Sequence, residues 1–120
     1  MAGEKVYFKL DFNIHEGKLA TFEQTAKTMI DGTKKESGAL GYEWFLSEDR
    51  KSCRLLETYA NADAMLAHMN ETVVRELLPK LLESATLAKF EVYGEPGAEG
   101  RGMLARSGAV IYAFRQGLGR

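Results

Sequence analysis

The feature that most constrains the fold of this chain is the order in which its hydrophobic spacing changes period. Residues 5–13 alternate apolar and polar side chains, as a strand with one buried face does. Residues 17–36 place apolar side chains three or four positions apart, which is helical spacing, and Gly38 suits the end of such a helix. Strand patterns return over residues 41–47 and 53–60, separated by the polar, hairpin-length run SEDRKS. The first half of the chain therefore predicts a strand, a helix and a strand hairpin.

Helical spacing returns after this hairpin. Asn61 is suited to cap the N-terminus of a helix that contains His68. A second apolar stripe of helical spacing covers residues 73–82. Pro79 interrupts this stripe, because proline has no N–H to bond back to the preceding turn. We therefore expect the helix to run to about Leu78 and to kink or restart at the proline.

The rest of the chain predicts a fourth strand and a C-terminal extension. Residues 86–94 alternate, and one face of this strand is expected to hold Ala88, Phe90 and Val92. The run GEPGAEGRG that follows is rich in turn residues and predicts a linker. Residues 108–114 then form an apolar segment, either a short fifth strand or an arm that a partner subunit would cover. We therefore divide the chain into a domain at residues 1–96 and an extension at residues 97–120.

The order β–α–β–β–α–β is typical of the ferredoxin-like fold, an α+β class with an antiparallel sheet and helices on one face. Another α+β sandwich is the alternative. Apolar side chains occur on both faces of the hairpin strands, because Trp44 and Phe45 point in opposite directions. The few helices of so short a chain can cover only one face of a sheet. We therefore expect a homodimer in which the two sheets face one another.

Composition limits the classes of partner and cofactor. Sixteen Lys and Arg residues against seventeen Asp and Glu give a net charge of −1, so no overall basic field favours nucleic acid or an anionic membrane. No window approaches the roughly 20 apolar residues of a membrane span. The single cysteine, Cys53, and the lack of an apolar run at the N-terminus favour a soluble, cytoplasmic protein. We expect no metal and no nucleotide cofactor, because ligand spacings and a Gly-rich dinucleotide loop are both missing.

His68 is the strongest candidate for chemistry. Glu57, eleven residues earlier at the end of a strand, could reach it on the second turn of the next helix. The carboxylate would then orient the imidazole as a general base. The alternative is a purely structural bond between Glu57 and His68 that fixes the helix on the sheet.

Three further residues are candidates for the walls of a pocket. Asn13 ends the first strand on a polar face that could line a polar cleft, although it could instead bond the backbone of the adjacent turn. Tyr42 and Trp44 are large aromatic residues on one strand. Such residues form pocket walls in some proteins and simple core packing in more of them.

The run YEWFLSEDRKSCRLLETYANADAMLAHM resembles the antibiotic biosynthesis monooxygenase family, small dimeric α+β barrel proteins that include quinol monooxygenases. The similarity is strongest at Glu-x-Tyr followed by a histidine eleven residues after the glutamate, here Glu57, Tyr59 and His68. It covers about residues 5–96. Residues 97–120 look like the C-terminal extension of one subgroup.

This resemblance implies a homodimer whose two sheets close into a barrel, with one pocket per subunit between sheet and helices. Enzymes of the family oxidise phenols or quinols with O₂ and need no metal or flavin. The substrate anion itself reduces oxygen, so the protein must deprotonate and bury a small aromatic substrate. The resemblance assigns the proton-handling roles to His68, Glu57 and Asn13, and substrate contacts to Trp44, Tyr42 and Tyr59.

Two other functions remain open. The same fold also hosts non-catalytic ligand-binding and stress-response modules, which would use the same pocket without consuming oxygen. A haem-binding protein is a third alternative. Haem-degrading relatives carry a tryptophan about ten residues before the histidine, whereas this chain has Thr58 near that spacing.

Overall fold

The computed structural model describes residues 4–119. Residues 1–3 of the predicted domain and residue 120 of the predicted extension lie outside the described part. Strands and helices follow in the order β1 (Val6–Ile14), α1 (Leu19–Thr33), β2 (Ala39–Leu46), β3 (Ser52–Tyr59), α2 (Ala62–Met69), α3 (Thr72–Ser84), β4 (Ala85–Tyr93), α4 (Gly97–Arg106) and β5 (Val110–Tyr112). No helix of residues 4–119 is long and apolar enough to cross a membrane.

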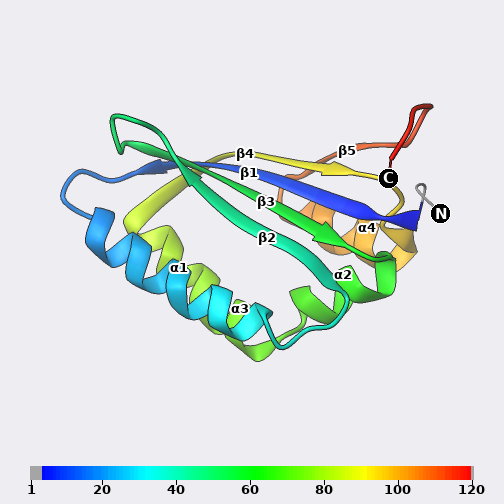
Figure 1. The fold of residues 1–120 in the computed structure, drawn as a ribbon, viewed down its shortest axis with the longest axis horizontal. Helices are drawn as coiled ribbons and strands as arrows, with labels where there is room; N and C mark the ends of the chain where they lie inside the picture. The colour runs from blue at the N-terminus through cyan, green and yellow to red at the C-terminus, as the bar shows by residue number, and fades with distance from the viewer. Residues whose placement is uncertain (1–3, 120) are drawn as a thin grey trace.

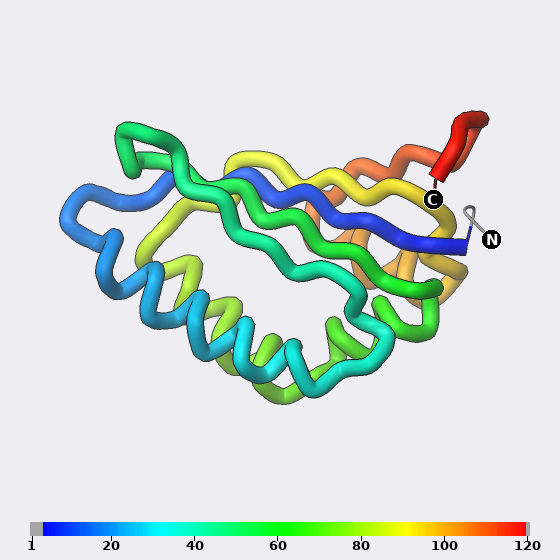
Figure 2. Tube along the Cα trace, in the orientation of Figure 1, coloured from blue at the N-terminus to red at the C-terminus, as the bar shows by residue number. Residues whose placement is uncertain are grey.

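The strands form one sheet in the order β2-β3-β1-β4-β5. The first four are antiparallel to their neighbours, and β5 runs parallel to β4 at the edge. This order of the four antiparallel strands is that of a ferredoxin-like sheet, so the predicted fold class is confirmed. The helices of the described residues, α1 to α4, all lie on one side of the sheet (Figure 1). Helices α1 and α3 pack side by side beneath it (Figure 2).

The alternation of β1 separates a buried face from an open one, as predicted. Val6, Phe8, Leu10 and Phe12 are each at most 6% exposed and face the helices. Phe12 meets the ring of Phe22 from α1 at a centroid distance of 5.8 Å. Alternate residues of the strand lie on the other face, which no helix of the described chain covers. The sheet therefore has a packed face and an open face.

The loop that leads into β2 approaches α2 closely at Gly38. We predicted this glycine for a positive φ at the end of the first helix, but α1 ends at Thr33 and Gly38 has no positive φ. A Cβ atom on Gly38 would instead lie 2.5 Å from the Cβ of Ala64. Asn61 caps α2 as predicted, because its side chain accepts a hydrogen bond from the N–H of Ala64 at 2.9 Å. Glycine at this position thus permits close contact between the loop and the helix.

The predicted helix end near Leu78 is wrong. The helical region breaks after α2 instead, and α3 continues through Pro79 to its end at Ser84. Pro79 and Arg75 are both exposed. Water can therefore satisfy the carbonyl of Arg75 that lacks an N–H partner, which lowers the cost of a proline at this point. The fully buried Leu81 anchors the last turn of the helix.

A bulge changes which residues of β4 face the helices. Phe90 pairs with Leu10, but Leu87 pairs with Phe12, so the register shifts by one residue between these pairs. Ala88 is exposed. The prediction that it shares a face with Phe90 is therefore wrong, since an extra residue in one strand reverses the alternation beyond it. Leu87 takes its place on the packed face.

The C-terminal segment is more ordered than predicted. The helix α4 begins within the run expected to be a linker and continues beyond it to Arg106; it packs against α2 and buries Leu104 completely. Gly100 permits this packing, because a Cβ atom there would lie 2.6 Å from the Cε of Met65. Of the two alternatives for residues 108–114, a short fifth strand or an arm, the structure shows the strand, β5. It pairs with β4 of its own chain and leaves Val110 and Tyr112 exposed.

Candidate active site

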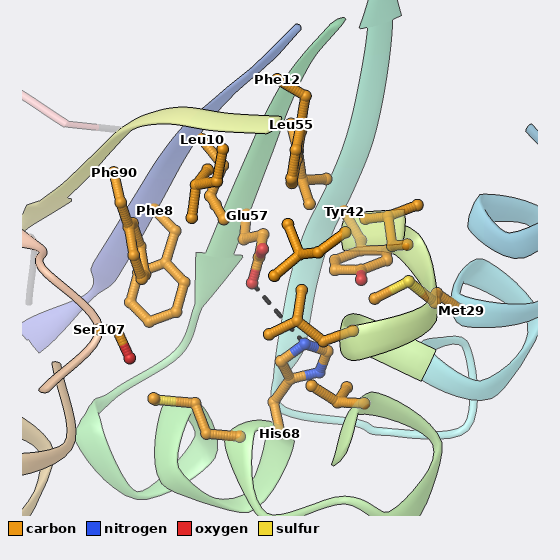
Figure 3. Close-up of a pocket in the computed structure, with 16 residues that line it drawn as sticks. Phe8, Leu10, Phe12, Met29, Tyr42, Leu55, Glu57, His68, Phe90 and Ser107 are labelled. Carbon is orange, nitrogen blue, oxygen red and sulfur yellow. Dashed lines mark ion pairs between the residues drawn. The ribbon is translucent and has the colours of Figure 1, made fainter. Parts of the chain in front are cut away.

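A cavity of about 290 Å³ lies between the packed face of the sheet and the helices (Figure 3). Its lining is mainly apolar: Phe8, Leu10, Phe12, Leu55, Leu87 and Phe90 come from the sheet, and Met29, Met69, Val74, Leu78, Leu81 and Leu82 come from the helices. The polar lining residues are Tyr42, Glu57, His68 and Ser107. A mostly apolar cavity with a few polar groups is typical of a site for a small organic ligand.

Glu57 reaches this cavity because of its place in β3. It alternates with residues of the open face, so that it lies beside Phe8 of β1 and Tyr42 of β2. Only 5% of the residue is exposed, and its Oε1 accepts a hydrogen bond from the hydroxyl of Tyr59. Burial raises the pKa of Glu57, against the opposing effects of His68 and the Tyr59 hydrogen bond. A carboxyl group with a raised pKa can exchange protons with weakly acidic ligands.

His68 lies between two carboxylates. Its Nε2 is 3.7 Å from Oε1 of Glu57, and its Nδ1 is 3.0 Å from Oε1 of Glu36. The side chain is 3% exposed, and its ring contacts Tyr42 and Tyr59 at centroid distances of 5.3 and 5.2 Å. The structure thus brings Glu57 and His68 close together, as their spacing in the sequence suggested, and places Tyr42 and Tyr59 beside them.

The two tyrosines are neutral hydrogen-bonding groups. Burial, followed by the nearby Glu57, raises the pKa of both Tyr42 and Tyr59 far above that of a free phenol. Their hydroxyls therefore keep their protons at physiological pH. Tyr42 lines the cavity directly, whereas Tyr59 is fully buried and supports Glu57 from within the sheet.

Asn13 and Trp44 do not line this cavity. Asn13 is exposed, next to Phe12 on β1 and therefore on the opposite face of the strand. Trp44 stacks on Phe12 at 6.2 Å and also contacts Phe22 at 5.8 Å. It lines a smaller hollow between α1 and the hairpin strands. The polar face of β1 that we expected to border a cleft is the open face of the sheet.

Glu36 is the site residue that sequence reasoning missed. It follows the end of α1 in the run KKESG and is separated from His68 by 32 positions. Nothing in its local spacing distinguishes it from the neighbouring exposed charges. The contact forms only because the loop before β2 folds against α2, which depends on the small size of Gly38.

The cavity lining has an acidic residue, Glu57, but no lysine or arginine among the described residues. Within residues 4–119, no three His, Cys, Asp or Glu side chains gather as metal ligands would. The donors at the cavity wall can therefore bind and exchange protons, and they do not form a cation-binding cluster.

Comparison with known proteins places this architecture in a family. The sequence profile of the antibiotic biosynthesis monooxygenases matches residues 7–80, which run from the second residue of β1 through most of α3 and include Tyr42, Glu57, Tyr59 and His68. The chain belongs to the antibiotic biosynthesis monooxygenase family. Among curated proteins, none matches the sequence.

Solved structures agree with this assignment at the level of the fold. MupZ from Pseudomonas fluorescens is 25% identical with a TM-score of 0.83, and the match covers 98% of this chain and 95% of MupZ. SnoaB from Streptomyces nogalater, described as a cofactor-independent oxygenase, is 16% identical with a TM-score of 0.69, covering 79% of this chain and 96% of SnoaB. A conserved Methanosarcina mazei protein is 19% identical with a TM-score of 0.70, covering 78% and 95%. The similarity to MupZ thus extends into the C-terminal segment.

Proposed function

We propose that this family member is a cofactor-independent monooxygenase that oxidises a small aromatic phenol or quinol with O₂. The observation that carries the proposal is the buried pair of Glu57 and His68 at the wall of an otherwise apolar cavity. An apolar enclosure favours an aromatic body, and the acid–base pair offers a place for one ionisable hydroxyl. Family membership and the described oxygenase activity of SnoaB support the same reading.

In the proposed reaction, the substrate hydroxyl gives its proton to the Glu57–His68 pair. The resulting electron-rich anion transfers electrons to O₂. One oxygen atom becomes bonded to a ring carbon, and the other leaves as water with the two hydrogens that the substrate loses. The protein supplies a base, a fixed orientation of the substrate and exclusion of bulk water. The side chains that line the cavity can provide all three.

The charge of the cavity lining limits the class of substrate. An anionic ligand would enter beside Glu57, and the cavity lining formed by residues 4–119 has no lysine or arginine to compensate its charge. The substrate is therefore proposed to enter neutral and to lose its proton only after it is bound. Phenols, naphthols and quinols satisfy this condition, whereas aromatic carboxylic acids, which are already ionised at neutral pH, do not.

We also propose a homodimer that associates through the open face of the sheet. That face carries the exposed side chains of Tyr7, Phe45, Leu56 and Tyr112, between 37% and 51% exposed. Asp11 pairs there with Arg54 at 3.1 Å, so charged groups accompany the apolar ones. A sheet with apolar residues on its uncovered face favours association with a second sheet. Closure of the two sheets would form the barrel that the family resemblance implies.

The proposed activity is tested by oxygen consumption. Purified protein, without added metal or flavin, is mixed with a panel of phenols, naphthols and quinols, and with the corresponding carboxylic acids as matched controls. We expect oxygen uptake with at least one neutral member of the panel and none with the acids. Binding of several panel members without oxygen uptake would favour a non-catalytic ligand-binding module instead.

A further inference from the structure

His68 faces Glu57 of the cavity wall on one side and is hydrogen-bonded on the other side to Glu36, which reaches the protein surface. Glu36 is 16% exposed at its side chain, whereas the side chains of His68 and Glu57 are 3% and 6% exposed. Glu36 also lines a surface hollow together with Lys35, Ser37, Asp63 and others, separate from the cavity. The imidazole therefore bridges a buried carboxyl group and a carboxylate in contact with solvent.

We propose that Glu36 is a proton-relay residue that connects the buried Glu57–His68 pair with bulk water. This role rests on the proposed function, because it assigns a path to the proton that the substrate loses. It goes beyond the residues that touch the substrate, since Glu36 acts through His68. In this role Glu36 is a positioning and relay residue rather than a catalytic one.

One outward passage of a proton converts His68 from the Nδ1–H to the Nε2–H tautomer, and the return passage restores it. The substrate O–H proton passes to Glu57, and the protonated Glu57 passes it to Nε2 of His68. The proton on Nδ1 of His68 passes to the carboxylate of Glu36, and Glu36 releases it to water in the surface hollow. The same sequence in reverse returns a proton to the cavity when reduced oxygen needs one.

The distances indicate which step needs motion. The 3.0 Å between Nδ1 and Glu36 is already that of a hydrogen bond. The 3.7 Å between Nε2 and Glu57 exceeds the roughly 3 Å of an N–H···O bond. The inner transfer therefore requires a small approach of the two groups, or a ligand hydroxyl placed between them, whereas the outer transfer is ready to occur.

The other groups that face His68 leave this route as the favoured one. Within the described part of the chain, the ionisable groups in contact with the imidazole are Glu36, Glu57, Tyr42 and Tyr59. Both tyrosine hydroxyls have a raised pKa and hold their protons. If His68 served only to hold α2 in place, one hydrogen bond from its ring would be enough. Here each nitrogen faces a different carboxyl group, and only one of the two carboxyl groups reaches water.

The first test uses Glu36→Gln, which preserves the size of the side chain and an oxygen acceptor for Nδ1 but cannot take up a proton. We expect kcat to fall by about tenfold or more with KM nearly unchanged, and the solvent deuterium isotope effect on kcat to rise. Glu36→Asp, which retains a carboxylate, should recover part of the rate, and added formate should partly rescue Glu36→Ala, whose shorter side chain leaves room for it. Asp63→Asn removes a negative charge from the same hollow and should leave kcat unchanged.

A second test does not depend on turnover. Protein labelled with ¹⁵N-histidine allows exchange of the His68 imidazole N–H with water to be measured by NMR, with exposed His15 as an internal control. We expect Glu36→Gln to slow this exchange at least severalfold while the rest of the spectrum shows an intact fold. Exchange as fast as in the wild type would overturn the relay, as would equal kcat values in wild type and Glu36→Gln. Slowed exchange in a protein that oxidises no panel member would refute the proposed oxidation and retain the relay.

Discussion

The Nδ1 atom of His68 lies 3.0 Å from Oε1 of Glu36, although 32 positions separate the two residues in the chain. This contact fixes the ring so that Nε2 points toward Glu57, within 3.7 Å. An imidazole held by one carboxylate presents its other nitrogen in a defined direction. The orientation of the candidate base therefore depends on the loop between α1 and β2 as much as on the helix that carries the histidine.

Replacement of His68 by alanine should lower oxygen consumption with an active substrate by about 10²–10⁴-fold, because a positioned general base contributes that much. Exposed His15, which contacts Thr86 and the carbonyl of Glu83, provides the matched control. His15→Ala should retain activity within about twofold of wild type. Circular dichroism and size-exclusion chromatography should show that both variants fold as the wild type does. Full activity in folded His68→Ala would remove this residue from the mechanism.

The stability of the protein should depend on the ionisation of Glu57. Burial raises the pKa of this carboxyl group in the folded state above its unfolded value of about 4.3, so the folded state binds more protons between the two values. The associated stability is fully present below the unfolded pKa and is lost as pH rises through the folded pKa. Glu57→Gln, which stays neutral, should therefore gain stability relative to wild type as pH rises.

Urea denaturation of wild type and Glu57→Gln at pH 5 and pH 8 measures this difference. The advantage of the variant should be larger at pH 8. Glu43→Gln, at an exposed position on the neighbouring strand, serves as the control and should differ little from wild type at either pH. If the free energies of unfolding of wild type and Glu57→Gln differed by the same amount at both pH values, ionisation of Glu57 would not be the cause.

Gly38→Ala should destabilise the protein by roughly 1–3 kcal/mol, because the added methyl group would lie 2.5 Å from the Cβ of Ala64 and would force the loop away from α2. Gly102→Ala is the control, since a Cβ atom there meets only the end of the Arg106 side chain at 3.8 Å. Alanine in that helix should be neutral or stabilising by up to about 1 kcal/mol. Chemical denaturation measures both effects. Equal tolerance of the two substitutions would show that the loop has room to move.

Leu56→Glu should weaken the proposed dimer, because it places a charge on the open face of the sheet where an apolar side chain is 38% exposed. Leu82→Glu changes a leucine of α3 with the same 38% exposure and should leave the oligomeric state unchanged. Light scattering coupled to size-exclusion chromatography reports the mass of each variant. A wild-type protein that remains monomeric at high micromolar concentration would refute the proposed association.

Much of the fold could be predicted because the information is local. Alternation identified the four main strands, and helical spacing identified α1, α2 and the start of α3. The helix α4 could not be predicted, since its sequence contains three glycines and its order depends on burying Leu104 beside α2. The bulge that exposes Ala88 could not be predicted from the sequence either, because it arises from the pairing of β4 with β1.

The candidate site could be predicted in part for the same reason. Glu57 and His68 come from a strand and the helix that follows it, so their proximity follows from a short stretch of sequence. Glu36 comes from a distant loop, and no spacing connects it to the pair. Asn13 was selected because its face is polar, but the cavity lies on the apolar face. An apolar cavity with few polar groups resembles ordinary core in sequence.

The two faces of β1 have a consequence for how such a protein can diverge. Phe8, Leu10 and Phe12 border the cavity, whereas the residues between them belong to the uncovered surface. A substitution at a cavity residue can change ligand preference and leave the association of subunits unchanged. A substitution on the uncovered surface can change the association of subunits and leave ligand preference unchanged. An insertion of one residue within the strand would exchange the two sets at once. Laboratory evolution of new specificities should therefore accept substitutions along β1 and reject single-residue insertions there.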